Sequence, residues 1–409
     1  MSIEIHIDWR GQTILVGRLH SDEGSSSVSF EYASEWLERE GAFSIDPTSL
    51  PLQRNPHHAK SLFGALQDCG PDRWGRVLIE RAVRKKFLRQ KPYREIDYVL
   101  ALDDTSRIGA LRFRLNANSP FLACGDGRLP PLVSLRALMR AADAIHGETE
   151  TAKDLRLLLG EGSPLGGARP KSAVTLADGT LGIAKFPKPD DTRDIAAGEV
   201  LGLQLAREAG IQTADFQLVK VGGRSVTVVK RFDRASNTRI PFISAASLLG
   251  LSQGDDGAYT LIADAIRQFG HDVAGDLQEL WRRMVFSLLA SNYDDHLRNH
   301  GFIMSEHGRW SLSPAFDLNP APQIDRPGMN KTAITEDQEE PSLAVAMAAA
   351  SRFGIKAKEA KAILKKAFVA VSGWRETGHH LRIKSSTLDI YASAFEHSIM
   401  DEAKRVLGS

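Results

Sequence analysis

The stretch SNYDDHLRNHGF (291–302) places two aspartates, two histidines, an arginine and two asparagines directly after an apolar helical segment. In that segment, apolar side chains recur at helical spacing from Leu277 to Leu289, which predicts one long amphipathic helix. Such a density of polar groups after a buried helix is typical of a solvated loop or of a catalytic loop. The rest of the sequence has to distinguish these two interpretations.

Length and composition set broad limits. The chain has 409 residues, of which 42% are hydrophobic and 25% charged, as in soluble proteins of two or three domains. A net charge of +1 gives no overall attraction to nucleic acid or membranes. Cys69 and Cys124 form neither a disulfide framework nor a CxxC motif. The first residues do not read as a signal peptide and no apolar run is long enough to span a bilayer, so we expect a cytoplasmic protein.

The periodicity predicts strands first and helices later. Ile3, Ile5 and Ile7 alternate with polar residues, as in a half-buried strand, and residues 13–19 would return as a hairpin. Further strands are expected at 28–32, in two hairpins within 172–187 and 216–232, and at 301–304 and 310–314. Residues 116–131, rich in Gly, Pro and small polar residues, form the best candidate for a linker. Beyond about residue 244 the pattern is mostly helical.

Four segments carry side chains suited to phosphate chemistry. GEGSPLGGARPK (160–171) is a glycine-rich loop ending in Lys171, and such loops let backbone amides approach phosphate oxygens. Lys185 lies within an apolar strand, where a lysine is expected to meet a fixed anion. Asp294 and Asn299 share the opening stretch, and Asp317 follows the last predicted hairpin. Each segment taken alone is weak support, because an ordinary loop or a strand-edge lysine has the same composition.

Their order along the chain is more informative. Phosphoryl transfer needs a lysine on the phosphates, a carboxylate at the acceptor hydroxyl, and an Asn and an Asp on Mg²⁺. The chain supplies a glycine loop, Lys185, a helical Glu199, the Asp294/Asn299 pair and Asp317, in the order found in protein kinases. We therefore favour the catalytic-loop interpretation of residues 291–302.

The sequence resembles the HipA-like serine/threonine kinases, the toxins of bacterial toxin–antitoxin modules. The matching motifs are FGALQDCGPDRWGRVLIER (63–81), GGARPK (166–171), AKFP (184–187), VKRFDR (229–234), NYDDHLRNHGF (292–302) and PAFDLNP (314–320). The resemblance implies an α+β, two-lobed, protein-kinase-like fold with a β-rich N-terminal subdomain and an all-helical C-lobe. It implies four parts: an N-terminal subdomain (1–115), a linker and helix (116–149), a nucleotide-binding N-lobe (150–232) and a catalytic C-lobe (233–409).

The resemblance also implies a role for each matching residue, with ATP and Mg²⁺ as cofactors. Asp294 corresponds to the catalytic aspartate, Lys185 to the ATP-orienting lysine braced by Glu199, and Asn299 and Asp317 to the Mg²⁺ ligands. The implied nucleotide contacts are the phosphate loop (Gly166, Gly167, Ala168, Arg169, Pro170, Lys171), the adenine hinge (Lys230, Arg231, Phe232), Asp233 at the ribose, and His296 and Phe316.

One departure concerns regulation. Family members often carry a serine in the phosphate loop whose autophosphorylation silences the kinase. Here Pro164 stands at that position and Ser163 precedes it, so Ser163 is the candidate autophosphorylation site. A phosphate there would add about −1.5 to −2 charges beside an anion site.

The family also implies partners: a translation-related protein target such as an aminoacyl-tRNA synthetase, a HipB-like helix-turn-helix antitoxin, and operator DNA mainly through that antitoxin. Three alternatives stay open. In the first, the chain is a kinase-like co-repressor without significant activity. In the second, it is a metal-dependent phosphoesterase that uses Asp294, Asp295 and His296. In the third, His296 and His300 bind zinc. The absence of HExxH disfavours zinc.

Overall fold

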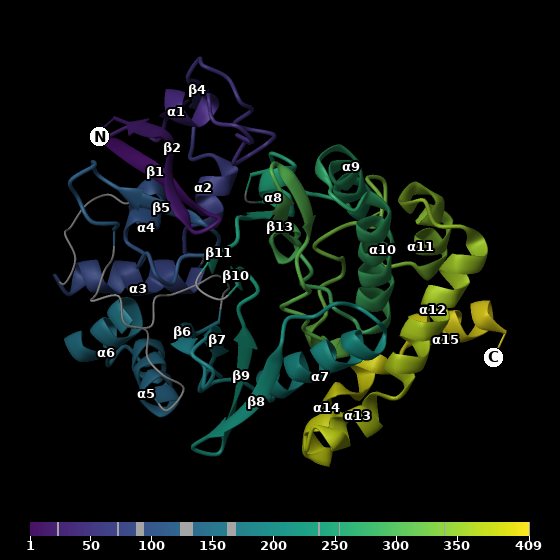
Figure 1. Ribbon diagram of the computed structural model, residues 1–409. Coiled ribbons are helices and arrows are strands. Elements are labelled where there is room, and N and C mark those ends of the chain that lie inside the picture. Colours follow the sequence, from purple (N-terminus) through teal and green to yellow (C-terminus); the bar gives the residue numbers. More distant parts are fainter. Residues whose placement is uncertain are drawn as a thin grey trace. The chain divides into compact units, whose positions relative to one another are not determined.

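Figure 1 shows the computed structural model of the chain, which describes residues 1–22, 24–71, 73–86, 94–122, 134–161, 169–235, 238–252, 254–338 and 340–408. The chain divides into two compact units. The first consists of Met1–Asp191 and Val219–Ile243, and the second of Thr192–Leu218 and Ser244–Ser409.

This division differs from the predicted boundaries at two places. The segment 233–243 belongs to the first unit and not to the C-lobe. Helix α7 (Ile195–Glu208) belongs to the second unit, because it packs against α12 (Ala357–Ser372) and α13 (Trp374–His380). Sequence periodicity shows that α7 is a helix but cannot show which partner covers its apolar face.

The first unit contains a five-stranded sheet in the order β4-β3-β2-β1-β5. The predicted N-terminal hairpin and third strand are confirmed, and Arg10 and Gly11 turn the hairpin with positive φ angles of 50° and 77°. The first strand of this hairpin was expected to be buried on one face, but both of its faces are buried, because Glu4 and His6 are buried as well. Arg114 donates to Glu4 at 2.9 Å, and this pairing lets the polar face be covered. The strands are β1 (Ser2–Trp9), β2 (Gln12–Ser21), β3 (Val28–Tyr32), β4 (His57–Ala59) and β5 (Leu111–Arg114).

A second sheet in the same unit, β6-β7-β9-β8, carries the two predicted later hairpins. Its apolar face shares one core with helices from much earlier in the chain: Trp74 and Leu78 of α3 pack with Val174, Ala184 and Val228 of the sheet. The strands are β6 (Lys171–Thr175), β7 (Leu181–Lys185), β8 (Phe216–Val221) and β9 (Arg224–Lys230). The helices are α1 (Ser34–Leu37), α2 (Gly64–Asp68), α3 (Arg73–Arg84), α4 (Glu95–Leu100), α5 (Leu135–His146), α6 (Ala152–Arg156) and the π-helix η2 (Leu157–Glu161). The short strands β10 (Arg234–Ala235) and β11 (Thr238–Arg239) complete the unit.

The second unit is built around α10 (Val273–Leu289), which packs against α9 (Tyr259–Phe269), α11 (Leu343–Ala349) and α12. It is not all-helical: β13 (Gly301–Glu306) and β14 (Arg309–Leu312) form a hairpin around Gly308. This hairpin confirms the strands predicted at 301–304 and 310–314. The other elements of this unit are α8 (Ala245–Leu248), η3 (Leu297–Asn299), η4 (Gln323–Asp325), η5 (Ala350–Phe353), α14 (Ser385–Phe395) and α15 (Ser398–Leu407), and the strand β12 (Phe242–Ser244) spans the point where the chain passes from the first unit to the second.

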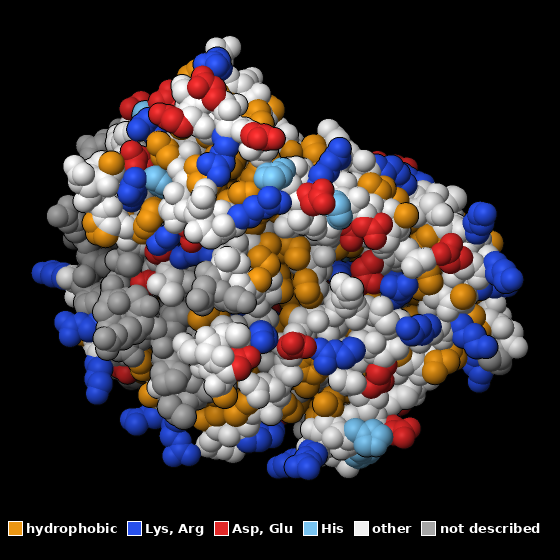
Figure 2. Space-filling model, viewed as in Figure 1, with side chains coloured by type: hydrophobic (Ala, Val, Ile, Leu, Met, Phe, Trp, Pro, Cys, Tyr) orange, Lys and Arg blue, Asp and Glu red, His pale blue; other side chains and the backbone are white. Residues whose placement is uncertain are grey.

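Positive and negative side chains are mixed on the surface, as expected from a net charge of +1. On the face shown in Figure 2, Lys and Arg side chains are interspersed with Asp and Glu. Within the described ranges, no helix is long and apolar enough to cross a membrane. Cys69 is a buried free thiol, and burial raises its pKa to about 12, while Cys124 lies outside the described residues.

Candidate functional site

The stretch 291–302 begins where the buried helix α10 ends. Leu280, Trp281 and Leu289 have no exposed surface, so the helix holds the start of the loop firmly. Ser291 turns the chain with a φ of +52°, and the backbone amide of Asn292 donates to the carbonyl of Ser287 at 2.9 Å. The loop is thus attached to the core at its first two residues.

Two residues that the sequence singles out meet inside this loop. The side-chain Nδ2 of Asn299 donates to the backbone carbonyl of Asp294 at 3.0 Å. Asn299 is buried in the short helix η3, whereas Asp294 is exposed. With Nδ2 engaged in this bond, the Oδ1 atom of Asn299 is the side-chain atom that can serve as a metal ligand.

Asp317 lies in a second loop that is tied to the first. Its φ of +59° is in the left-handed region, which costs energy for residues other than glycine and recurs both in turns and at functional sites. Asn319 stabilises this conformation, since its Nδ2 donates to both the carbonyl and Oδ1 of Asp317 at 3.1 Å. The backbone amide of Asn319 in turn donates to Oδ1 of Asn292 at 3.0 Å. The structure therefore brings the Asp294 loop and the Asp317 turn together.

Asp294 and Asp317 also influence each other electrostatically. Although Asp294 is exposed as a residue, desolvation of its carboxyl group raises the pKa above its ordinary value. His296 opposes that rise in pKa, and the negative charge of Asp317 adds to it. Two carboxylates in one electrostatic neighbourhood are stabilised by a bound cation.

The donor set fits Mg²⁺ better than zinc. Mg²⁺ is usually held by one or two carboxylates together with substrate phosphates, so Asp317 with Asn299 is sufficient. Within the described parts of the chain, no group of three or more His, Cys, Asp and Glu side chains is arranged to hold a metal ion. His300 is buried, with its Nε2 atom 3.4 Å from Oδ1 of Asp295.

His296 and Phe316 lie in the same two loops and are both half-buried. The Nδ1 atom of His296 is buried without a hydrogen-bond partner among the residues that the structure describes. Buried polar atoms are nearly always paired, so a lone one at a candidate site fits a ligand contact. The nucleotide contact inferred for His296 stays a prediction with this support.

The first unit supplies two lysines on neighbouring strands. In the β6–β7 ladder Lys171 is directly opposite Lys185, which places both side chains on the same face of the sheet. Lys171 is only 5% exposed, and its carbonyl accepts a hydrogen bond of 3.1 Å from Nε1 of Trp74 in α3. Lysine ammonium groups commonly bind phosphate oxygens, and this role of Lys171 and Lys185 stays a prediction.

Three of the six residues of the predicted phosphate loop are described. Ser163, Gly166, Gly167 and Ala168 lie outside the described residues. Of the remaining members, Arg169 is ion-paired with Asp191, and the carbonyl of Pro170 accepts from the amide of Phe186 at 2.8 Å. These contacts fix the segment that leads into β6.

The predicted adenine hinge follows β9. Lys230 is half-buried and its Nζ lies 3.0 Å from Asp178, while the ring of Phe232 lies 6.2 Å from that of Phe242. Arg231 is buried, and its guanidinium donates to the carbonyl of Arg107 at 3.0 Å. The backbone contact of this segment with adenine stays a prediction.

The geometry argues against the ribose contact inferred for Asp233. Its side chain is 2% exposed and accepts hydrogen bonds from Nε of Arg231 and the amide of Gly109, both at 2.7 Å. Arg234 donates to the same carboxylate at 2.6 Å. Both carboxylate oxygens accept hydrogen bonds from protein donors in a buried position, which favours a structural role for Asp233 in this unit. Sequence alone could not show this, because Gly109 is far away along the chain.

Glu199 is a buried residue of α7 in the second unit, whereas Lys185 ends β7 in the first. Their ion pair stays a prediction.

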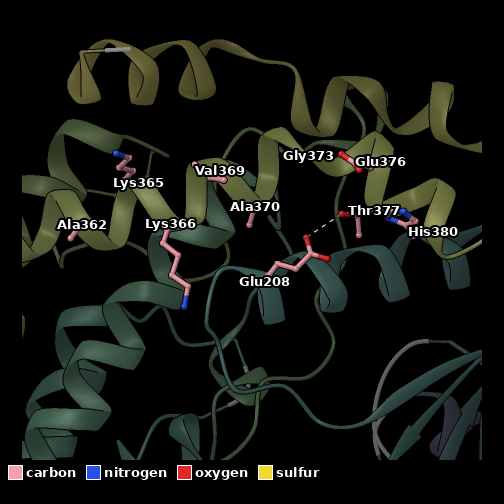
Figure 3. Close-up of a pocket in the computed structure, with 10 residues that line it drawn as sticks. All are labelled: Glu208, Ala362, Lys365, Lys366, Val369, Ala370, Gly373, Glu376, Thr377 and His380. Carbon is pink, nitrogen blue, oxygen red and sulfur yellow. Dashed lines mark hydrogen bonds between the residues drawn. The ribbon is translucent and has the colours of Figure 1, made fainter.

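A cavity of about 560 Å³ in the second unit lies between the end of α7 and helices α12 and α13. Figure 3 shows it with Glu208, which accepts a 3.1 Å hydrogen bond from Thr377, and with Lys366. None of the predicted site residues lines it.

Comparison with known proteins adds independent information. The model of the HipA N-terminal domain matches residues 9–114, and that of the HipA-like C-terminal domain matches residues 163–374. A solved structure of HipA from Shewanella oneidensis MR-1, in complex with HipB and operator DNA, superposes with a TM-score of 0.71 at 17% identity, covering 99% of this chain and 97% of that one. At that identity the likeness shows the fold.

Two curated proteins match a shorter part. A protein of Sinorhizobium fredii named "Putative kinase Y4dM" is 30% identical over 160 residues, which is 35% of this chain and 38% of that protein. A Haemophilus influenzae protein named "Putative kinase" is 26% identical over 156 residues, 34% of this chain and 46% of that protein. The matches thus span less than half the length of these relatives. The two domain matches confirm the resemblance drawn from the motifs, and the chain belongs to the HipA family of kinase-like proteins.

Proposed function

We propose that this chain is an ATP- and Mg²⁺-dependent serine/threonine protein kinase and the toxin of a HipA/HipB-like toxin–antitoxin module. The observation that carries the proposal is the hydrogen bond from the Asn319 amide to Oδ1 of Asn292, which joins the Asp294–Asn299 loop to the Asp317 turn, while the side chains of Asn299 and Asn319 brace one loop each. This arrangement supports the proposal because phosphoryl transfer needs a carboxylate and metal ligands close together. The cross-strand pair of Lys171 and Lys185 supports the proposal from the other unit.

Each residue then has a defined task. Asp317 and Asn299 would hold Mg²⁺, which when bound offsets negative charge on the phosphate oxygens. Asp294 orients the acceptor hydroxyl and takes its proton, and its raised pKa suits a group that exchanges a proton. Lys171 and Lys185 bind phosphate oxygens, and His296 and Phe316 contact the nucleotide.

The biological setting follows from the family. The Shewanella relative was solved with HipB and operator DNA. By analogy, we expect this chain to bind a small helix-turn-helix antitoxin and to reach operator DNA mainly through it. We further expect a cytoplasmic protein target with a Ser or Thr acceptor, from the translation apparatus, such as an aminoacyl-tRNA synthetase.

The kinase proposal is tested by incubating the purified chain with γ-labelled ATP, with Mg²⁺ or with EDTA, in the presence of a cell lysate as a source of acceptors. We expect label on Ser or Thr of protein with Mg²⁺ and none with EDTA. An Asp294→Asn chain purified in the same way controls for contaminating kinases. Transfer that is equal for both chains, or absent for both, would contradict the kinase proposal, and absence would favour the co-repressor alternative. Phosphate released from phosphoesters without ATP would favour the phosphoesterase.

Autophosphorylation is a separate prediction for Ser163. Phosphosite mass spectrometry should find phosphate on Ser163 after incubation with ATP, and not in the Asp294→Asn chain. Because the phosphate adds about two negative charges to the predicted phosphate-binding segment, the modified chain should bind ATP more weakly. A Ser163→Ala chain should keep its activity over time while the unaltered chain loses it. If Ser163 carries no phosphate in the active chain, this regulatory role is wrong.

A further inference from the structure

Asp295 has the opposite environment from its neighbour Asp294. Asp294 is exposed, whereas Asp295 is 6% exposed and faces the core of the second unit. Its Oδ2 atom accepts hydrogen bonds from the hydroxyl of Tyr259, the first residue of α9, and from Oγ of Ser287 in α10 at 3.1 Å. The backbone carbonyl of Asp295 accepts a further bond from Thr332 at 2.6 Å. The middle of the loop is therefore fastened to three separate segments.

Tyr259 is the donor in its hydrogen bond with Asp295. Burial raises the pKa of Tyr259 well above its ordinary value, and the charge of Asp295 raises it further. The Tyr259 hydroxyl is thus held in its protonated form and donates to Oδ2 of Asp295. A buried hydrogen bond to a charged acceptor is among the stronger ones.

The same hydrogen bonds continue to the other loop. Oγ of Ser287 also accepts from Nδ2 of Asn292 at 3.4 Å, and Oδ1 of Asn292 accepts from the amide of Asn319 at 3.0 Å. Asn319 then donates to Oδ1 of Asp317 at 3.1 Å. A continuous path thus runs from Tyr259 through Asp295, Ser287, Asn292 and Asn319 to the proposed metal ligand. We call these residues the loop-positioning network.

We propose that Asp295 is a positioning residue, and that the loop-positioning network sets the placement of Asp294 relative to Asp317. The inference rests on the proposed kinase function. It also accounts for the second aspartate of the DDH sequence, which the phosphoesterase alternative assigned to the reaction. A carboxylate whose Oδ2 is bound by Tyr259 and Ser287, in a buried position, holds the loop and does not reach a substrate.

The physical reason for an effect on the reaction is geometric. Phosphoryl transfer depends on holding the acceptor, the carboxylate and the metal in register, and a displacement of about 1 Å can reduce the rate by about 10²-fold. Residues that orient metal ligands typically contribute about 10- to 100-fold to activity. Loss of the network should thus lower kcat, while the KM for ATP stays close to its original value, because the lysines of the first unit are unaffected.

The test compares adjacent residues of α9. Tyr259→Phe removes the buried hydrogen bond to Asp295, and Thr260→Val removes a partly buried bond of 2.6 Å to the exposed Glu336, which lies outside the network. We expect Tyr259→Phe to lower kcat by about tenfold with unchanged KM for ATP, and Thr260→Val to leave both unchanged. Asn292→Ala, which interrupts the network at its centre without altering α9, should lower kcat by about 10- to 100-fold.

Rescue by a conservative change separates positioning from general stability. In Asp295→Asn the amide oxygen can still accept from Tyr259 and Ser287, so kcat should stay near that of the unaltered chain. Asp295→Leu is of similar size but leaves both donors without an acceptor, and should lower kcat by about 10- to 100-fold. A kcat that falls equally in both variants would show that the charge of Asp295, and not its position, matters, and would overturn the proposal.

Amide hydrogen exchange gives a readout that does not need activity. In Tyr259→Phe the amides of both 291–299 and 315–321 should exchange faster, and in Thr260→Val neither should change. If the unaltered chain transfers no phosphate but this exchange pattern is found, the kinase proposal fails and the network stands. If the chain is active and Tyr259→Phe and Asn292→Ala match it in kcat and in exchange, the network proposal is wrong.

Discussion

Asparagine in place of Asp294 is expected to lower the rate of phosphoryl transfer by about 10²- to 10⁴-fold while ATP binding stays unchanged. The substitution keeps the size of the side chain and removes the group that takes the proton of the acceptor hydroxyl. The backbone carbonyl of residue 294, which accepts the bond from Asn299, is retained, so the loop should keep its conformation. Steady-state kinetics and calorimetric titration with ATP and Mg²⁺ measure the two quantities.

Asp317→Asn is the matched comparison. Like Asp294→Asn, it replaces a carboxylate by an amide, but it does so at a proposed Mg²⁺ ligand. It should therefore weaken Mg²⁺-dependent ATP binding as well as lower kcat. The two variants therefore differ in KM although both lose activity. If Asp294→Asn weakened ATP binding as much as Asp317→Asn does, the separate roles proposed for the two carboxylates would be wrong.

Replacing Asp233 by asparagine is expected to destabilise the first unit by about 3–5 kcal/mol. The change leaves the buried guanidinium of Arg231 without its anionic partner, and removes charge from the acceptor of Arg234 and of the amide of Gly109. Equilibrium unfolding in urea measures the loss. Asp178→Asn is the control in the same unit, because Asp178 pairs with Lys230 at the exposed surface and its loss should have a much smaller effect.

The contribution of Asp233 should also depend on pH. Burial alone would raise the pKa of Asp233, but the charges of Arg231 and Arg234 outweigh it and lower the pKa to about 2 from its ordinary value of 3.8. A carboxyl group with a lowered pKa stabilises the folded state above pH 3.8 and loses that contribution as the pH falls toward 2. The stability difference between the unaltered chain and Asp233→Asn should therefore shrink below about pH 4. An unchanged unfolding midpoint with weaker ATP binding would instead support the ribose contact inferred from the sequence.

The buried state of Asp233 and that of Asp295 illustrate one limit of reading a sequence. Both stand beside residues with an assigned role, and both are aspartates in polar motifs, so spacing alone suggests chemistry for either. Their partners, Gly109 for Asp233 and Tyr259 for Asp295, lie far away in the chain. Nothing in the local pattern of Tyr259 marks it as a member of the site, and Asn292, although it lies in the NYDDHLRNHGF motif, receives no role from spacing alone, so only an alignment of relatives or the folded structure could have assigned them.

The sequence by itself determined the family, the strands and helices around the site, and the identity of Asp294, Asn299 and Asp317 as candidates. These features depend on residue type and on short spacing, which set backbone periodicity and donor chemistry within a few residues. Only the tertiary structure decided which aspartates are exposed, how the Asp294 and Asp317 loops are joined, and that α7 packs with the C-terminal helices. Burial and hydrogen-bond pairing depend on segments far apart in the chain, so they are fixed only when the chain folds.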